Sequence, residues 1–299
     1  MRTTDVRVTA DWLGLRESAD AAARSEALVD SLVALMGRQR KTSVEDTRPD
    51  GCGAPAPSPQ ALVIHDLGCG SGSMARWLAP RLPGPQRWIL HDRDPALLAV
   101  AEVDPPRVAA DGSWVTVETR RGDVTRLSSR SLTGASLMAA SALLDMFTGE
   151  DVDRVVESCV RAGCPALLTL SVTGHVRFTP ADSLDARLER AFNGHQRRTV
   201  AGRTLLGPGA VAVVARVFRG HGWGVHVANS AWHLDASNPA LTREWLCGWA
   251  GAAVEQRPEL AARAHDWLAR RTADVDAILS VTVEHVDLLV VPPTSAGEL

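Results

Sequence analysis

The feature that most constrains this chain is an apolar run that ends in an acid and a glycine-rich turn. The run reads Val63-Ile64-His65-Asp66-Leu67-Gly68-Cys69-Gly70-Ser71-Gly72. Glycines at alternate positions let the backbone approach a ligand closely. The residues that follow, 73–82, carry apolar side chains at helical spacing. A strand over 61–65, a ligand-binding turn and a helix are therefore expected here.

Asp66 stands two residues before the first glycine, at the carboxyl end of the expected strand. A carboxylate at that point attracts a ligand ammonium and repels a pyrophosphate. Dinucleotide-binding turns bind a pyrophosphate, and their GxGxxG spacing requires a glycine where this chain has Ser73. Both observations favour a ligand with a free amino group.

Strands and amphipathic helices alternate from residue 61 to the C-terminus. The expected strands are 61–65, 88–91, 114–119, 136–140, 166–172, 224–228 and 279–291. The expected helices are 73–82, 95–102, a helix after the N-cap Thr148, 181–192, 209–220 and 240–272. This alternation predicts an α/β fold with a doubly wound, seven-stranded, mostly parallel sheet and helices on both faces. Ligands of such sheets bind beyond the carboxyl ends of the strands.

The chain divides into two expected parts. Residues 1–60 form an N-terminal helical cover, helical over 11–36, and a Pro/Gly-rich loop. Residues 61–299 form the main domain, with helical insertions at about 178–207 and 238–276, after strands five and six. The second insertion carries Trp245, Trp249 and Trp267. It either covers the ligand site as a lid or packs through these tryptophans against the domain.

Two more acids follow the next two strands. Asp92 closes the second strand, where a carboxylate can accept hydrogen bonds from both hydroxyls of a ribose. Asp123, in Gly122-Asp123-Val124, follows the third strand and can accept from an exocyclic amine such as that of adenine. Each acid taken alone is also a common turn or cap residue. Three acids at the tips of successive strands indicate a nucleoside-binding crevice.

These motifs resemble the class I, Rossmann-like S-adenosylmethionine-dependent methyltransferases of the small-molecule type. The first motif of that family is an acid followed by GxGxG, its second strand ends in an acid, and its third motif is a Gly-Asp pair. The resemblance covers residues 60–172, and the run 279–291 fits the family's antiparallel seventh strand. One departure is Gly134–Leu137, which opens the fourth strand without the family's acid.

The resemblance implies S-adenosyl-L-methionine as cofactor and S-adenosyl-L-homocysteine as product. Asp66 and the glycine loop would hold the methionine part, Asp92 the ribose, and Asp123 with the Val124 backbone the adenine. The cofactor-binding residues implied in this way are Asp66, Gly68, Cys69, Gly70, Gly72, Asp92, Arg93, Asp123, Val124 and Ser141. The N-terminal helix bears Arg16 and Arg24, which either close over the cofactor, as such helices do in this family, or lie on the surface.

Methyl transfer depends mainly on orientation, and a general base is needed only where the nucleophile must lose a proton. Asp145, after strand four, and His175, after strand five, are the candidate catalytic residues. His195, Trp232 and His233 are the candidate substrate-binding residues. The alternatives are a turn role for Asp145 and a solvated helix end around His195.

Composition narrows the partners. The 299 residues are 45% hydrophobic and 22% charged, with a formal net charge of −3. The sequence contains no long Lys/Arg run, which argues against nucleic acid as a partner. No apolar run reaches the roughly 20 residues of a membrane span, and the five cysteines form neither CxxC pairs nor a zinc pattern. A metal-free cytoplasmic monomer or homodimer that methylates an O, N or C atom of a small molecule is expected. The alternatives are an NAD(P)-dependent Rossmann oxidoreductase and a non-catalytic, methyltransferase-like cofactor-binding protein.

Overall fold

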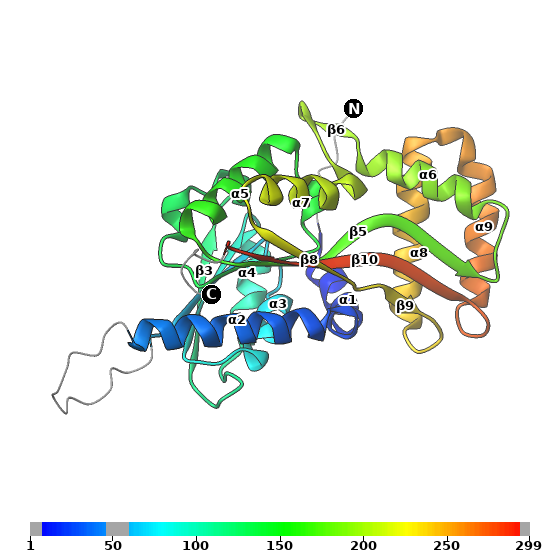
Figure 1. Cartoon of the computed structure of the whole chain (residues 1–299). Coiled ribbons are helices and arrows are strands. Elements are labelled where there is room, and N and C mark those ends of the chain that lie inside the picture. Colours follow the sequence, from blue (N-terminus) through cyan, green and yellow to red (C-terminus); the bar gives the residue numbers. More distant parts are fainter. Residues whose placement is uncertain (1–7, 46–59, 294–299) are drawn as a thin grey trace, which may run out of the picture.

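The computed structural model describes residues 8–45 and 60–293, and its centre is an eight-stranded sheet flanked by helices (Figure 1). The strands of this sheet are β1 (Leu62–Leu67), β2 (Gln86–Asp92), β3 (Val115–Arg121), β4 (Leu137–Ser141), β5 (Ala166–Thr179), β8 (Gly224–Asn229), β9 (Trp232–Leu234) and β10 (Ser280–Val291). Seven of them follow the order β3-β2-β1-β4-β5-β10-β8, and β9 pairs only with β10. The predicted fold class is confirmed.

The strands run parallel except at one edge, where β10 lies antiparallel to β5, β8 and β9. β1 lies between β2 and β4, so the chain turns from one half of the sheet to the other at this strand. Such a reversal opens a crevice at the carboxyl ends of the strands. The glycine loop after β1 lies at that point.

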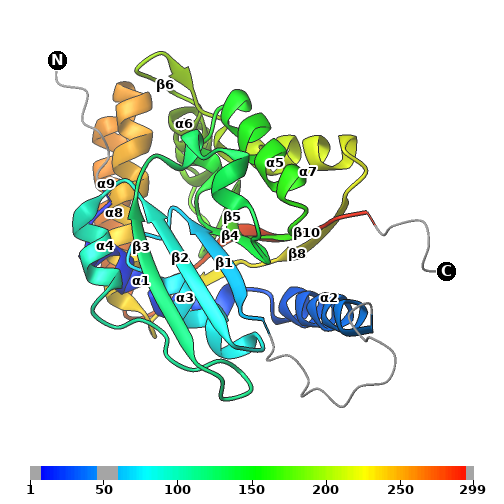
Figure 2. The ribbon, with the colours of Figure 1, turned by 90° about the vertical axis from the view of Figure 1, so that its left-hand side faces the viewer.

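Helices cover both faces of the sheet (Figures 1 and 2). One face carries α2 (Glu26–Glu45) and α3 (Ser73–Leu78), and the other carries α5 (Gly149–Ala162) and α7 (Ala210–Gly220). α4 (Pro95–Ala101) connects β2 with β3. Thr148 caps α5 as predicted, since its side chain accepts from the Asp151 N–H while the Asp151 carboxylate accepts from the Thr148 N–H. Each face has its own apolar core, centred on residues such as Leu32 and Trp88 on one side and Phe218 on the other.

The N-terminal segment is two helices, not the single one expected over 11–36. α1 (Ala10–Ala23) ends at Arg24, whose backbone is extended, and α2 begins at Glu26. The break is held in place because the Ser25 N–H donates to a carboxylate oxygen of the buried Asp287 on β10 (2.8 Å). This contact joins residues far apart in the sequence, so helical periodicity alone does not reveal it.

β5 and β10 continue well beyond the rest of the sheet and carry a helical lobe. β5 reaches Thr179, although the sequence predicts its end at 172, and it pairs with β10 as far as Ser280. α6 (Asp185–Gln196), α8 (Pro239–Gln256) and α9 (Ala261–Asp274) gather around this extension, at the right of Figure 1. The short strands β6 (Thr199–Val200) and β7 (Arg203–Thr204), like β9, were not predicted, because two or three residues carry no periodicity. No helix in the described part of the chain is long and apolar enough to cross a membrane.

Candidate functional site

The loop between β1 and α3 is shaped by three glycines. Gly68, Gly70 and Gly72 have φ values of 65°, 55° and 86°, in the left-handed region that favours glycine. A Cβ on Gly68 would lie 2.9 Å from Leu143 Cδ1, and one on Gly70 would lie 2.8 Å from Leu13 Cδ1. A side chain at either position would therefore also require a leucine side chain to shift. The contact of Leu13 with Gly70 also shows that α1 packs directly on the loop.

Asp92 fixes the loop from the end of β2. Its Oδ2 accepts from the Gly70 N–H (2.9 Å) and its Oδ1 from the Asp94 N–H (2.9 Å). The next main-chain contact, from the Cys69 N–H to the His91 oxygen (3.0 Å), ties the same two segments together. Each carboxylate oxygen has a second acceptor position, so the half-buried Asp92 can still accept from ligand hydroxyls.

Asp66 is fully buried, and neither of its carboxylate oxygens has a hydrogen-bond partner. Burial raises the pKa of this carboxyl to about 7, with a further rise caused by Asp92 and an opposing effect of the Arg24 guanidinium. A buried carboxylate without partners is costly, because it gives up its hydration without compensation. Asp66 is therefore suited to receive a cationic or hydrogen-bond-donating group.

Arg24, the residue that ends α1, lies in the same interior. It is 3% exposed, and its Nη2 donates to the hydroxyls of Ser141 (3.0 Å) and Ser73 (3.3 Å). Its Nε and Nη1 have no hydrogen-bond partner. Burial lowers the pKa of Arg24 despite the opposing field of Asp20, the next largest influence. Among the described residues, the interior thus holds two guanidinium nitrogens and two carboxylate oxygens that have no hydrogen-bond partner.

Asp123 lies at the third strand end, next to Asp92 in the sheet. β2 pairs with β3 up to Asp92 and Arg121, and the Gly122 N–H then donates to the Asp92 main-chain oxygen (2.9 Å). Burial works to raise the pKa of the Asp123 carboxyl, but hydrogen bonds from Thr125 outweigh it and the pKa is lowered. The side chain is exposed while Val124 is buried. Acids thus follow three adjacent strands, β1, β2 and β3, at one edge of the sheet.

A cavity of about 670 Å³, counted to its open mouth, lies beside the second half of β5. Its walls come from α1, α6, α8, β9 and the extensions of β5 and β10. Five aromatic side chains line it: Trp12, Phe192, Trp232, Trp245 and Trp249. Ionisable side chains also line it, namely Arg16, Asp145, His175, Glu284 and His285.

The charges in the cavity wall are mostly paired. Arg16 binds the buried Asp20 through Nε and Nη2 (3.0 and 3.1 Å), and Trp232 Nε1 donates to the same carboxylate (3.0 Å). Glu284 pairs with Arg177 (2.5 Å). Asp145 accepts a long hydrogen bond from the Gln196 amide (3.5 Å), and burial raises the pKa of its carboxyl.

His285 adds a neutral ring to the cavity. Burial, reinforced by the charge of Arg16, lowers the pKa of the His285 imidazole to about 3. Its Nδ1 has no hydrogen-bond partner. The ring therefore presents an uncharged polar edge at neutral pH.

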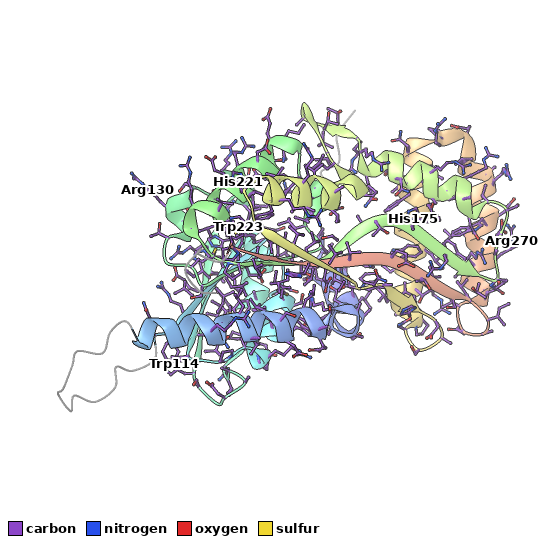
Figure 3. The ribbon with its side chains drawn as sticks, in the orientation of Figure 1. Trp114, Arg130, His175, His221, Trp223 and Arg270 are labelled. Atoms are coloured by element: carbon purple, nitrogen blue, oxygen red, sulfur yellow. The ribbon has the colours of Figure 1, made fainter. Side chains whose placement is uncertain are left out.

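The sequence-predicted candidates separate into two groups. Asp145, His175 and Trp232 line the cavity, although the His175 side chain is 74% exposed at the rim (Figure 3). His195 is buried in α6 with its ring 3.8 Å from Glu255, and His233 is exposed; neither lines this cavity.

Among the predicted cofactor residues, Ser141 contacts Arg24, Arg93 is exposed, and Cys69 is buried. Burial raises the pKa of the Cys69 thiol, so the thiol is not a nucleophile at neutral pH. In the ranges 8–45 and 60–293, no group of three or more His, Cys, Asp or Glu side chains is placed to hold a metal ion.

Five aromatic or polar wall residues were not singled out from the sequence: Trp12, Phe192, Gln196, Glu284 and His285. A signal existed for the last two, because Glu284 and His285 are adjacent ionisable residues between Val283 and Val286 of the terminal strand. In the sequence, Trp12 cannot be distinguished from the other apolar residues of the expected N-terminal helix. Its place in the cavity depends on the packing of α1 against the lobe.

Residues 64–165 match a family model described as a methyltransferase domain. Among solved structures, an S-adenosylmethionine-dependent methyltransferase from Geobacter sulfurreducens, in complex with S-adenosyl-L-homocysteine, is 15% identical, with a TM-score of 0.41 and coverage of 95% of this chain and 99% of that one. A second such methyltransferase, from Methanosarcina mazei, is 13% identical, with a TM-score of 0.42 and coverage of 79% and 95%. No curated protein matches the chain.

Proposed function

We propose that this chain, a member of the class I methyltransferases by its fold and by the match of residues 64–165, transfers a methyl group from S-adenosylmethionine to an O, N or C nucleophile of a small molecule. The resemblance stated from the sequence motifs is confirmed at the level of the family. The acceptor class and the residue roles are our proposal.

The buried pair of Asp66 and Arg24 is the observation that carries the proposal. The methionine part of the cofactor is a zwitterion, with an ammonium and a carboxylate on one carbon. In the described part of the chain, Asp66 has two carboxylate oxygens without partners, and Arg24 has two nitrogens, Nε and Nη1, without partners. We assign the ammonium to Asp66 and the carboxylate to Arg24, because charge-assisted hydrogen bonds of this kind are the strong ones. The residues present therefore fit the group.

The nucleoside part fits the other two strand ends. Asp92 keeps acceptor positions for the ribose hydroxyls while it holds Gly70 and Asp94. We assign the adenine to Asp123 and the Val124 backbone, and we keep Arg93 beside the ribose as a residue of this site. When bound, the cofactor supplies a methyl group on a positively charged sulfur, with a neutral thioether as leaving group.

The chain's own contribution is orientation, exclusion of water and, where needed, removal of a proton. α1 excludes water because Leu13 packs on the glycine loop and Trp12 lines the neighbouring cavity. Asp145 is our candidate for the base: it lies in the cavity wall, and burial raises the pKa of its carboxyl, which makes it a stronger base than an exposed carboxylate. His175 is the weaker candidate, since most of its side chain faces solvent.

Ligand-dependent thermal unfolding tests the proposal. S-adenosyl-L-methionine and S-adenosyl-L-homocysteine should each raise the unfolding temperature, and a ligand at a hundred times its dissociation constant adds about 2.7 kcal/mol to the free energy of unfolding. NAD and NADP should have no effect. Stabilisation by NAD, with none by S-adenosyl-L-homocysteine, would establish the oxidoreductase alternative and remove the methyltransferase proposal.

A further inference from the structure

The cavity beside the cofactor site has aromatic walls. Trp245 and Trp249 stack on each other at 5.5 Å between centroids and 22° between planes, and Phe192 lies 5.9 Å from Trp249. Trp12 and Trp232 add rings from α1 and β9. Rings from four separate elements therefore converge on one space, which suits a flat, apolar occupant.

The wall offers no unpaired cation or anion except at one place. Arg16 is neutralised by Asp20 and also lies over the Trp232 ring, 4.8 Å from its centroid, so that this ring face is already occupied by a cation. Glu284 is neutralised by Arg177. Only Asp145, with its long contact to Gln196, lacks a charged hydrogen-bond partner among the described residues. Because the one charge left without a charged partner is a carboxylate, an anionic occupant would give up its hydration without a matching counter-ion.

The same wall contains buried polar atoms that have no hydrogen-bond partner in the described part of the chain. Gln196 Oε1, Trp249 Nε1 and His285 Nδ1 are buried and have no partner. Gln196 joins Asp145, so an acceptor oxygen and a carboxylate lie together. A neutral group that donates a hydrogen bond, such as a hydroxyl, gives its proton to one of these two acceptors at no charge cost.

The cavity and the cofactor site share walls. Arg24 binds Ser141, and the next residue, Ala142, lines the cavity. Leu13 packs on Gly70, and its neighbour Trp12 lines the cavity. An occupant of the cavity is therefore next to the end of β4, where the methionine part is assigned.

From this arrangement we propose that the methyl acceptor is a neutral, planar aromatic alcohol, which stacks among the tryptophans and presents its hydroxyl to Asp145 and Gln196. The inference rests on the proposed function. In the transfer, the hydroxyl proton passes to the Asp145 carboxylate and a lone pair of the oxygen forms the O–CH3 bond. The S–CH3 bond breaks, and its electron pair stays on sulfur as the neutral thioether.

Calorimetry with three matched probes tests the inference, in the presence of saturating S-adenosyl-L-homocysteine. The probes are 2-naphthol, the planar cation N-methylquinolinium and the flexible decan-1-ol. We expect 2-naphthol to bind at least about tenfold more tightly than either of the others, because only it combines stacking with neutrality. Tighter binding of the cation, tighter binding of the chain alcohol, or no binding of any probe would overturn the inference.

Two variants place the binding in this cavity. Trp245→Leu removes a half-buried wall ring, and Gln196→Leu removes the acceptor next to Asp145. Each should weaken 2-naphthol about tenfold while S-adenosyl-L-homocysteine affinity stays within about twofold, which also shows that the variant is folded. Trp114→Phe, on an exposed ring outside the cavity (Figure 3), is the matched control and should change neither affinity.

Failure of the inference is distinguishable from failure of the proposed function. Binding of S-adenosyl-L-homocysteine without 2-naphthol overturns the acceptor class and leaves methyl transfer standing. Binding of 2-naphthol by a protein that does not bind S-adenosyl-L-homocysteine overturns the proposed function, whereas the cavity assignment stands. Detection of 2-methoxynaphthalene by mass spectrometry, at a rate that Asp145→Asn abolishes, supports both.

Discussion

Arg24 and Asp66 lie together in the interior, where the guanidinium lowers the pKa of the carboxyl, yet no hydrogen bond joins them. A buried arginine and a buried aspartate in the same interior ordinarily form an ion pair, since each charge compensates the lost hydration of the other. Here Arg24 binds two serine hydroxyls and Asp66 binds nothing. The absence of this ion pair is explained if a zwitterionic ligand binds between the two residues, with its ammonium on Asp66 and its carboxylate on Arg24.

The first prediction concerns Arg24→Met, which keeps the apolar stem and removes the charge. S-adenosyl-L-homocysteine affinity should fall about 100-fold, or about 2.7 kcal/mol, because hydrogen bonds to a charged group are lost. Affinity for 5′-methylthioadenosine, which has no amino acid part, should stay within about twofold. Isothermal calorimetry of both ligands measures the difference.

Arg81→Met is the control for this measurement. Both arginines lie over the Trp77 ring, Arg24 at 5.3 Å and Arg81 at 4.7 Å from its centroid. Arg81, however, pairs with the exposed Glu26 outside the site. It should change neither affinity. An equal loss of both ligands in Arg24→Met would mean that Arg24 supports the fold of the site and does not bind the carboxylate.

The second prediction concerns the N-terminal helix. Asp66 is completely buried, and Leu13, near the start of α1, packs on Gly70. We therefore expect that a ligand reaches the glycine loop only when the start of α1 moves. In hydrogen–deuterium exchange, amides of Ala10–Ala23 should exchange faster than those of α5 in the free protein. S-adenosyl-L-homocysteine should slow their exchange. Unchanged exchange in α1, with protection confined to the loops after β1 to β3, would contradict this role.

The third prediction separates the two candidate bases. Asp145→Asn should lower kcat by about 100-fold or more, with little change in the KM for S-adenosylmethionine, if proton removal is part of the step. His175→Ala should stay within about threefold of the wild type, because that ring is largely solvated. In the wild type the rate should rise with pH through the raised pKa of the Asp145 carboxyl. Steady-state kinetics across the pH range measures all three.

The local parts of this molecule could be predicted from the sequence. Asp66, Asp92 and Asp123 were expected after three successive strands, and these strands are adjacent in the sheet. That expectation depends on short segments, since a strand, its turn and the next helix are neighbours in the chain. The capping box at Thr148 is local in the same way.

The cavity could not be predicted, because its wall joins distant segments. Trp12, Phe192 and Trp249 come from three helices spread over most of the chain, and they meet only because β5 and β10 extend beyond the sheet. The role of Arg24 is equally non-local. Its hydroxyl partners, Ser73 and Ser141, lie on other elements, and helical spacing does not show which face of α1 is buried.

The last prediction concerns a buried histidine pair in the sheet. His65 on β1 and His91 on β2 stack at 5.2 Å, and their Nδ1 and Nε2 atoms lie 3.0 Å apart, so the rings share one hydrogen bond. Burial lowers the pKa of each ring to about 4; for His65 the next largest influence is the neighbouring His91, and for His91 it is the charge of Arg120. In the unfolded chain the pKa of histidine is about 6.5, so the unfolded state binds more protons below that pH. The stability contributed by the neutral pair is therefore complete above about pH 6.5 and is lost as the pH falls towards 4.

Urea unfolding at pH 7.5 and pH 5.0 measures this loss, which should be about 2–4 kcal/mol for the two rings together. The double variant His65→Leu, His91→Leu should lose at least about 2 kcal/mol less over the same interval, because it has no rings to protonate. His221→Asn, on an exposed histidine (Figure 3), should keep the wild-type difference. If the double variant shows the full wild-type loss, the acid sensitivity belongs to other groups, and protonation of His65 and His91 does not limit the stability of the sheet.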